Sequence, residues 1–227
     1  MLILIATNSI FHNVEIQDIE SAETFINNLE KAKSLTDTKT QSEGAKKFYI
    51  SDLHFGHKNA IAFDNRPFFT VEEMNQKLIE NWNRAVSKND HVYVLGDMFW
   101  DNSIINDTMK QLNGNKYLIK GNHDRINSEM KKQFVWIKDY DEITDGENHV
   151  VLCHYPIPCY KNHFYGWHHL YGHVHNSFEN NMIDNFKYQM TSLYLKKCSM
   201  FNVGCMMPCM NYTPRTLDEI LNMNRED

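Results

Sequence analysis

The sequence lacks the features of a membrane or secreted protein. No stretch approaches the roughly 20 apolar residues that a membrane-spanning helix needs. The opening residues MLILIATNSIF have no basic segment and too short an apolar run for a secretory signal, and they predict a strand. The five cysteines are odd in number and contain no CxxC pair, so no disulfide framework or common zinc template is indicated. We therefore expect a cytoplasmic protein with reduced thiols and no membrane partner.

An excess of positive charge is also lacking. Lys and Arg number 23 against 29 Asp and Glu, which gives a formal net charge of -6 at pH 7. We therefore expect no broad basic surface for a nucleic-acid backbone. A nuclease stays open, because bound divalent cations could supply positive charge locally. With 227 residues, of which 42% are hydrophobic, the chain can form one substantial core and one small appendage.

The chain divides into two parts that differ in their pattern of apolar and polar residues. Residues 1–34 predict an apolar strand, a second strand through Phe11–Ile16 and a helix from Ser21 to Lys33. The following SLTDTKTQSEGA is polar, has no apolar periodicity and reads as a linker. We assign residues 1–45 to an N-terminal extension and residues 46–227 to the main domain.

Short apolar strands alternate with helical stretches in the main domain. The predicted strands are Phe48–Ile50, His91–Leu95, Lys116–Ile119, His149–Leu152 and Leu170–Tyr171. The clearest helix runs from Val71 to Val86, and Thr70 with Glu73 predicts a capping box at its start. This alternation favours an α/β core.

Each predicted strand is followed by residues typical of metal ligands. In chain order these are Asp52 and His54 in SDLH, Asp97 in LGD, Asn122, His123 and Asp124 in GNHD, His154, and His173 and His175 in GHVH. In extended backbone, residues two apart point to the same side and could share one ion. GNHD is the most specific of these motifs, and each of the others alone could equally be a solvated loop or a satisfied core histidine. Together, at strand ends that meet at one edge of an α/β sheet, they indicate a metal site.

The ordered set SDLH, GD, GNHD, a lone His after a strand, and GHVH resembles the calcineurin-like metallophosphoesterase superfamily. The resemblance covers residues 46–216 and includes FNVG at Phe201–Gly204. It implies a four-layer αββα sandwich, an α/β (α+β) fold with two mixed β-sheets. It also implies that Asp52, His54 and His175 hold one metal, that Asn122, His154 and His173 hold the other, and that Asp97 bridges both. His123 would be the proton donor to the leaving group, and Asp124 would orient the His123 imidazole.

Carboxylate, imidazole and amide ligands suit borderline or hard divalent ions. We expect two such ions, with Mn²⁺ preferred and Fe²⁺, Zn²⁺ or Ni²⁺ as alternatives. Two ions about 3.5–4 Å apart can depress the pKa of a bridging water and supply a hydroxide for in-line attack on phosphorus.

Several residues near the motifs are candidates for substrate contact. Arg66 could grip phosphate, Trp100 could stack on a base, and Tyr155 lies beside His154 in sequence. His57, Trp167 and His168 are further candidates. A loop-capping surface pair is the alternative for Arg66, and a solvated loop is the alternative for the histidine-rich stretch around His168.

The expected substrate is a phosphodiester or a small phosphomonoester, with nucleotide-like esters among the options. GDMFWD lacks an Arg after the Asp pair, GNHD ends in Asp, and Tyr-Pro follows His154. These departures disfavour the protein Ser/Thr phosphatase branch, which remains an alternative. A catalytically silent binding module is another. A dinuclear hydrolase of amides or lactones is disfavoured, since those place an HxH motif early and here it comes last.

Overall fold

The computed structural model describes residues 2–7, 10–15, 44–195 and 198–224. The chain separates into two compact units, Met1–Gly44 and Ala45–Asp227. In the first, β1 (Leu2–Thr7) and β2 (Ile10–Glu15) pair as an antiparallel hairpin. The helix predicted over residues 21–33 and residues 34–43 of the linker after it lie outside the described residues.

Two mixed sheets form the second unit. The five-stranded sheet has the order β11-β3-β4-β5-β6. Its members are β3 (Lys47–Ile50), β4 (His91–Val94), β5 (Asn115–Ile119) and β6 (Ile137–Lys138), all parallel, and β11 (Arg215–Thr216), antiparallel to β3. The four-stranded sheet has the order β10-β9-β8-β7. Its members are β8 (Asn148–Cys153), β9 (His168–Tyr171) and β10 (Met200–Asn202), parallel to one another, and β7 (Tyr140–Asp145), antiparallel to β8.

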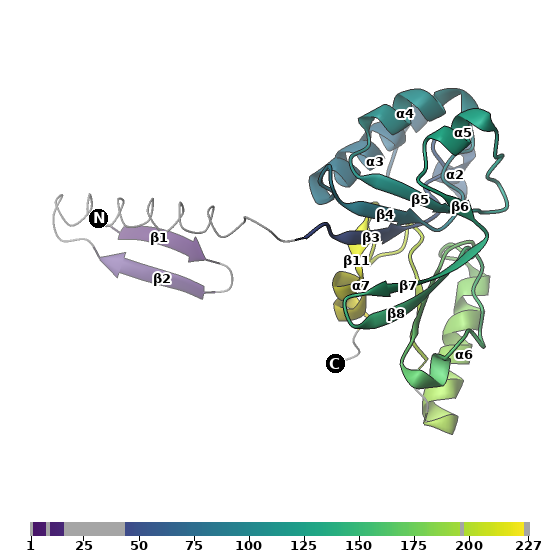
Figure 1. Ribbon diagram of the computed structural model, residues 1–227. Coiled ribbons are helices and arrows are strands. Elements are labelled where there is room, and N and C mark those ends of the chain that lie inside the picture. Colours follow the sequence, from purple (N-terminus) through teal and green to yellow (C-terminus); the bar gives the residue numbers. More distant parts are fainter. Residues whose placement is uncertain (1, 8–9, 16–43, 196–197, 225–227) are drawn as a thin grey trace. The chain divides into compact units, whose positions relative to one another are not determined.

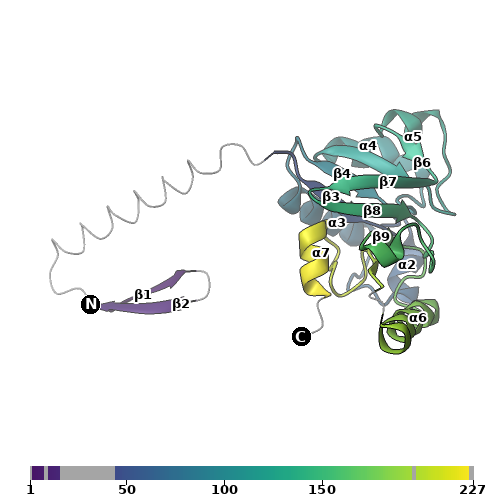
Figure 2. The same ribbon diagram turned by 60° about the horizontal axis from the view of Figure 1, so that its bottom comes forward.

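Helices cover the outer faces of these sheets. The helices are α2 (Lys58–Phe63), α3 (Val71–Ala85), α4 (Ile105–Gln111), α5 (Ser128–Lys132), α6 (Phe178–Tyr194) and α7 (Leu217–Met223), with 3-10 turns η1 (Asn102–Ile104) and η2 (His163–Tyr165). Figure 1 shows α3, α4 and α5 over the five-stranded sheet and α6 on the side of the four-stranded sheet, and Figure 2 brings α6 and α7 forward. The expected α/β fold with two mixed sheets is confirmed. In the part of the chain described here, no helix is both long and apolar enough to cross a membrane.

The core lies between the sheets and under the helices. Ile50, Val94, Val150 and Leu152 are completely buried and belong to one apolar cluster that both sheets share. Strands covered on both faces read as continuous apolar runs, which is why these segments were evident in the sequence. A second cluster, around Tyr171 of β9, packs against α6.

Helix α3 begins where its capping signal predicts. The hydroxyl of Thr70 accepts the backbone N–H of Glu73 at 3.1 Å. The Glu73 carboxylate accepts from Phe69 N at 2.7 Å, so it reaches one residue further back than a capping box requires. Met74, Leu78 and Trp82 then point into the core from the same helix.

Candidate metal centre

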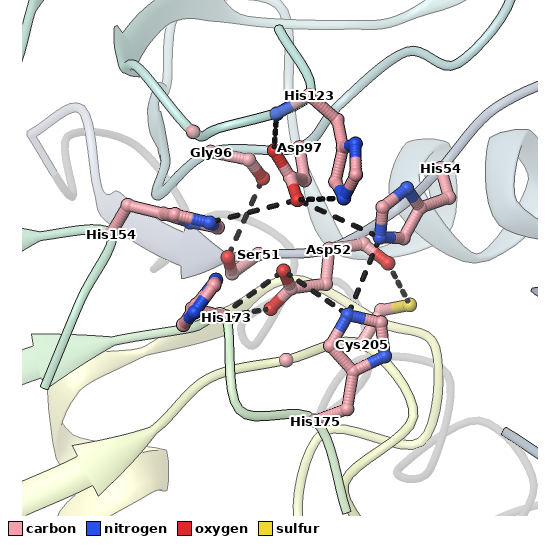
Figure 3. A network of polar contacts seen from close by, with 12 residues as sticks. Ser51, Asp52, His54, Gly96, Asp97, His123, His154, His173, His175 and Cys205 are labelled. Carbon is pink, nitrogen blue, oxygen red and sulfur yellow. Dashed lines mark hydrogen bonds and ion pairs between the residues drawn. The ribbon is translucent and has the colours of Figure 1, made fainter.

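The five predicted strand ends meet at one place in the second unit. The loops after β3, β4 and β5 bring side chains from the five-stranded sheet, and the loops after β8 and β9 bring them from the four-stranded sheet. Figure 3 shows the imidazoles of His54, His154, His173 and His175 arranged around the carboxylates of Asp52 and Asp97. The structure therefore brings together residues that lie far apart in sequence, such as His54 and His175, which are separated by 121 positions.

The backbone at these positions is not extended, contrary to the expectation for the DxH and HxH pairs. Asp52, His54, Asp97, His173 and His175 all have positive φ, between 48° and 70°. Non-glycine residues seldom adopt this left-handed conformation, and where they do, they cluster at functional sites. A sharp turn at each residue, rather than strand alternation, aims these side chains at a common centre.

One group of ligand atoms comes from Asp52, His54 and His175. The Nε2 atoms of His54 and His175 are 3.3 Å apart. His175 Nε2 is also 3.6 Å from Asp52 Oδ1. Each of the three residues offers one ligand atom within 4.8 Å of the others, which is a spacing that a single ion could span.

A second group surrounds His154. Its Nε2 lies 3.0 Å from Asn122 Oδ1 and 3.6 Å from Asp97 Oδ2. Asn122 Oδ1 is in turn 3.0 Å from His173 Nδ1. Asp97 Oδ2 also lies 3.9 Å from His54 Nε2, so this carboxylate stands between the two groups.

The electrostatics of these residues suit bound cations. Burial raises the pKa of both Asp52 and Asp97, because it removes the water that would stabilise the charged carboxylates. Burial lowers the pKa of His54 to about 2, and it also lowers the pKa of His154. The rings are therefore neutral and can offer lone pairs, while divalent ions would offset the cost of burying the carboxylates. This donor set fits two divalent ions.

Hydrogen bonds behind the ligands fix the direction of two rings. His154 Nδ1 donates to the carbonyl oxygen of Leu95 at 2.7 Å, and His175 Nδ1 donates to Asp64 Oδ1 at 2.7 Å. Each bond leaves Nε2 as the nitrogen with the free lone pair. Burial opposes a charge on His175, but the bond to Asp64 and the charges of Asp52 and Asp64 together outweigh burial and raise the pKa of the ring.

Asp64 and Arg66 join the first and last motifs. Arg66 donates through Nε and Nη2 to Asp64 Oδ2, at 2.9 and 2.8 Å. It also donates to the carbonyl oxygens of Leu53 and Asp52, at 2.9 and 3.0 Å. Arg66 thereby holds the SDLH loop, while Asp64 holds His175 of GHVH.

Arg66 therefore lies beneath the site and not at its mouth. Its residue exposure is 4%, and all three guanidinium nitrogens bond within the chain. These contacts do not match the expected grip on phosphate. Asp64 was missed altogether, because nothing in the sequence links it to His175, 111 positions away.

Asp124 also differs from expectation. Its carboxylate accepts the backbone N–H groups of Asp97, Met98 and Gly121, at 2.9, 3.0 and 2.8 Å. The hydrogen bonds that the structure gives Asp124 thus go to backbone and not to the His123 ring. Asp124 fixes the two loops that carry Asp97 and Asn122, because its short acidic side chain is buried between them.

His123 is anchored through its backbone and exposed through its ring. Its N–H donates to Asp97 Oδ1 at 2.8 Å, and its Nε2 lies 4.0 Å from Asp97 Oδ2. The side chain is 44% exposed and faces a cavity of about 460 Å³ beside the histidine cluster. A cavity of similar size, about 470 Å³, lies along α3 and contains none of the predicted ligands.

The other substrate candidates divide between the cavity and positions outside its lining. Trp100 lines the cavity. Tyr155 is not among the lining residues, but its ring centroid lies 4.6 Å from that of His173, which is. Trp167 instead stacks on His149 at 4.7 Å, and His168 lies within β9.

The calcineurin-like phosphoesterase family matches residues 48–192, a stretch that contains every predicted ligand. The uncharacterised protein MJ1445 of Methanocaldococcus jannaschii is 33% identical over 179 residues, which cover 78% of this chain and 89% of that protein. The gene 66 protein of Mycobacterium phage L5 is 35% identical over 86 residues, 34% of this chain and 39% of the phage protein. A solved structure, the protein of unknown function AQ665 from Aquifex aeolicus, is 24% identical to this chain, with a TM-score of 0.60. The match covers 79% of this chain and all of the AQ665 chain, and it supports the fold alone. The chain belongs to the calcineurin-like phosphoesterase family, whose members depend on metal ions.

Proposed function

We propose that the protein is a metal-dependent hydrolase of a phosphodiester or a small phosphomonoester. The observation that carries this proposal is that seven ligand-type side chains lie together at the strand ends of the two sheets: Asp52, His54, Asp97, Asn122, His154, His173 and His175. The set holds no thiolate, which disfavours a purely structural zinc site.

Two ions would share the site. Asp52, His54 and His175 would hold one, and Asn122, His154 and His173 the other, with Asp97 contacting both. Mn²⁺ is the first choice, with Fe²⁺, Zn²⁺ or Ni²⁺ as alternatives. When bound, such ions polarise the phosphoryl group and activate water for in-line attack.

The chain's own residues supply the remaining functions. The exposed ring of His123 would donate a proton to the leaving oxygen, while its backbone bond to Asp97 keeps it beside the ligands. Asp64 and Arg66 would act as positioning residues, since their hydrogen bonds hold the segments that carry the ligands.

The test is a parallel assay of metal-stripped protein refilled with Mn²⁺. The substrates are bis-(p-nitrophenyl) phosphate, p-nitrophenyl phosphate and cyclic nucleotides. We expect Mn²⁺-dependent hydrolysis of at least one ester and its loss in Asp97→Asn. A folded, metal-loaded protein inactive on all of them would contradict the proposal and favour a catalytically silent binding module.

A further inference from the structure

One side of the cavity is a wall of three aromatic rings, formed by Phe63, His57 and Trp100. Phe63 ends α2 and is 54% exposed, and Trp100 follows β4 and is 43% exposed. His57 lies between them, stacked on Trp100 with ring centroids 3.7 Å apart and planes 2° apart. Its centroid is 5.4 Å from that of Phe63. All three rings line the cavity that contains the candidate metal centre.

The wall lies beside the residues that would perform the chemistry. The centroid of Trp100 is 5.1 Å from that of His123, and Phe63 is 5.8 Å from His175. His57 stacks on the indole, and Trp100 is nevertheless 43% exposed, so indole surface outside this contact is open. A flat ring could stack there, immediately next to the group that would protonate the leaving oxygen.

The charged residues that line the cavity limit the kinds of substrate that could carry such a ring. Among the described residues that line it there is neither Lys nor Arg. Its acidic members are Asp64, which pairs with Arg66, and Glu179. A polyphosphate or a long nucleic acid would thus find no cationic side chain here for its extra charges.

We propose that the substrate is a nucleoside phosphodiester whose leaving group is a nucleoside with its base stacked on Trp100. This rests on the proposed hydrolase function. Water adds its oxygen to phosphorus, and the bond between phosphorus and the nucleoside oxygen breaks. His123 gives that oxygen a proton and is reprotonated by solvent, which takes up the proton that the attacking water releases. The products are a phosphomonoester and a free nucleoside hydroxyl.

The test uses the Mn²⁺-loaded full chain and three diesters. One is a deoxydinucleoside monophosphate with two adenines. The second lacks the base on the nucleoside that leaves, and the third lacks the base on the nucleoside that keeps the phosphate. Stacking on an aromatic side chain is typically worth enough to change kcat/KM by about tenfold. Removal of the leaving-side base should therefore lower kcat/KM of the wild type about tenfold, and Trp100→Ala should match this loss on the complete diester.

Trp100→Ala should have little effect on the diester that already lacks the leaving-side base, and Trp100→Phe should retain most of the wild-type rate. Phe69→Ala is the matched control, because Phe69 is 96% exposed and does not line this cavity. A second readout is the equilibrium affinity for a dinucleoside joined by a non-hydrolysable methylenephosphonate. Trp100→Ala should weaken this binding by a similar factor.

Equal effects of Trp100→Ala on all three diesters, or no effect on any, would overturn the base-stacking proposal. Hydrolysis of bis-(p-nitrophenyl) phosphate in the same preparations would show that the proposed hydrolase function still holds. If no ester is hydrolysed, the hydrolase function fails, and the binding titration still decides whether Trp100 holds a base.

Discussion

At the scale of single residues, His123 combines a fixed backbone with a free ring. His123→Ala removes the ring but keeps the N–H that donates to Asp97, so both ions should remain bound. Turnover of an alkyl ester should fall by about 10²–10⁴-fold, the usual worth of general acid catalysis for a poor leaving group. The loss should be much smaller for a p-nitrophenyl ester, because p-nitrophenolate is stable without a proton. Rates on both esters, with metal content measured in parallel, check this.

Equal losses on the two esters, or loss of metal, would show that His123 contacts the phosphoryl group or an ion instead.

Asp64 offers a test of the positioning contacts. Asp64→Asn removes the charge that supports His175 and pairs with Arg66. Loss of such a partner typically costs 10–100-fold in metal affinity. In a calorimetric titration of metal-stripped protein with Mn²⁺, one binding step should weaken by this factor and the other should persist. Asp141→Asn is the control, because Asp141 pairs with Lys138 on the surface and does not line the cavity. Two unchanged binding steps in Asp64→Asn would refute the positioning role.

At the scale of elements, the close approach of two loops depends on Gly172. A Cβ at this position would collide with the side chains of Ser51 and Asp52. The next residue, His173, donates its N–H to the Asp52 carboxylate, at 3.1 Å to the nearer oxygen. Gly172→Ala should therefore displace Asp52 and cost the protein at least one bound ion, as measured by elemental analysis.

Gly146→Ala is the matched control for Gly172→Ala. Gly146 has a φ of +59° and no other atom near its would-be Cβ, so alanine there brings backbone strain without a collision. It should lower Tm slightly and leave metal content unchanged. Full metal occupancy in Gly172→Ala would show that the loops can separate without harm to the site.

The elements that could be predicted from sequence are those with continuous apolar runs or clear helical spacing. The buried strands and α3 belong to this group, and their observed ends fall within one or two residues of the predicted ones. β7 was not predicted, because it is an edge strand with no fully buried residue in YDEITD. Helix α6 was missed because Phe178, Met182 and Leu193 are exposed, so its apolar residues do not mark a single face.

The ligand-type residues could be predicted because their chemistry is visible at each strand end. Their left-handed backbone, the Asp64–Arg66 pair and the backbone contacts of Asp124 could not. These features depend on contacts between distant segments, such as the bond from His175 to Asp64. They become evident only when both sheets are in place.

At the scale of the whole molecule, the second unit contains everything the proposed chemistry needs. All seven predicted ligands and the apolar cluster shared by the two sheets lie within Ala45–Asp227. A truncated protein that starts at Ala45 should fold, bind two ions and keep its turnover on bis-(p-nitrophenyl) phosphate. Circular dichroism and metal analysis would control for folding. A folded, metal-loaded truncation without activity would show that residues 1–44 contribute to the site.

The central claim, that two ions share Asp97 in a hydrolytic site, is tested most directly by titrating metal-stripped protein with Mn²⁺. Bound metal and hydrolysis of bis-(p-nitrophenyl) phosphate are followed together, for wild type and Asp97→Asn. We predict two ions per wild-type chain, with activity that appears as the second ion binds. Asp97→Asn should bind fewer ions and stay inactive, because it removes the charge of the one carboxylate that lies between both ligand groups. Wild-type protein with two bound ions and no hydrolysis, or unchanged stoichiometry in Asp97→Asn, would contradict the claim.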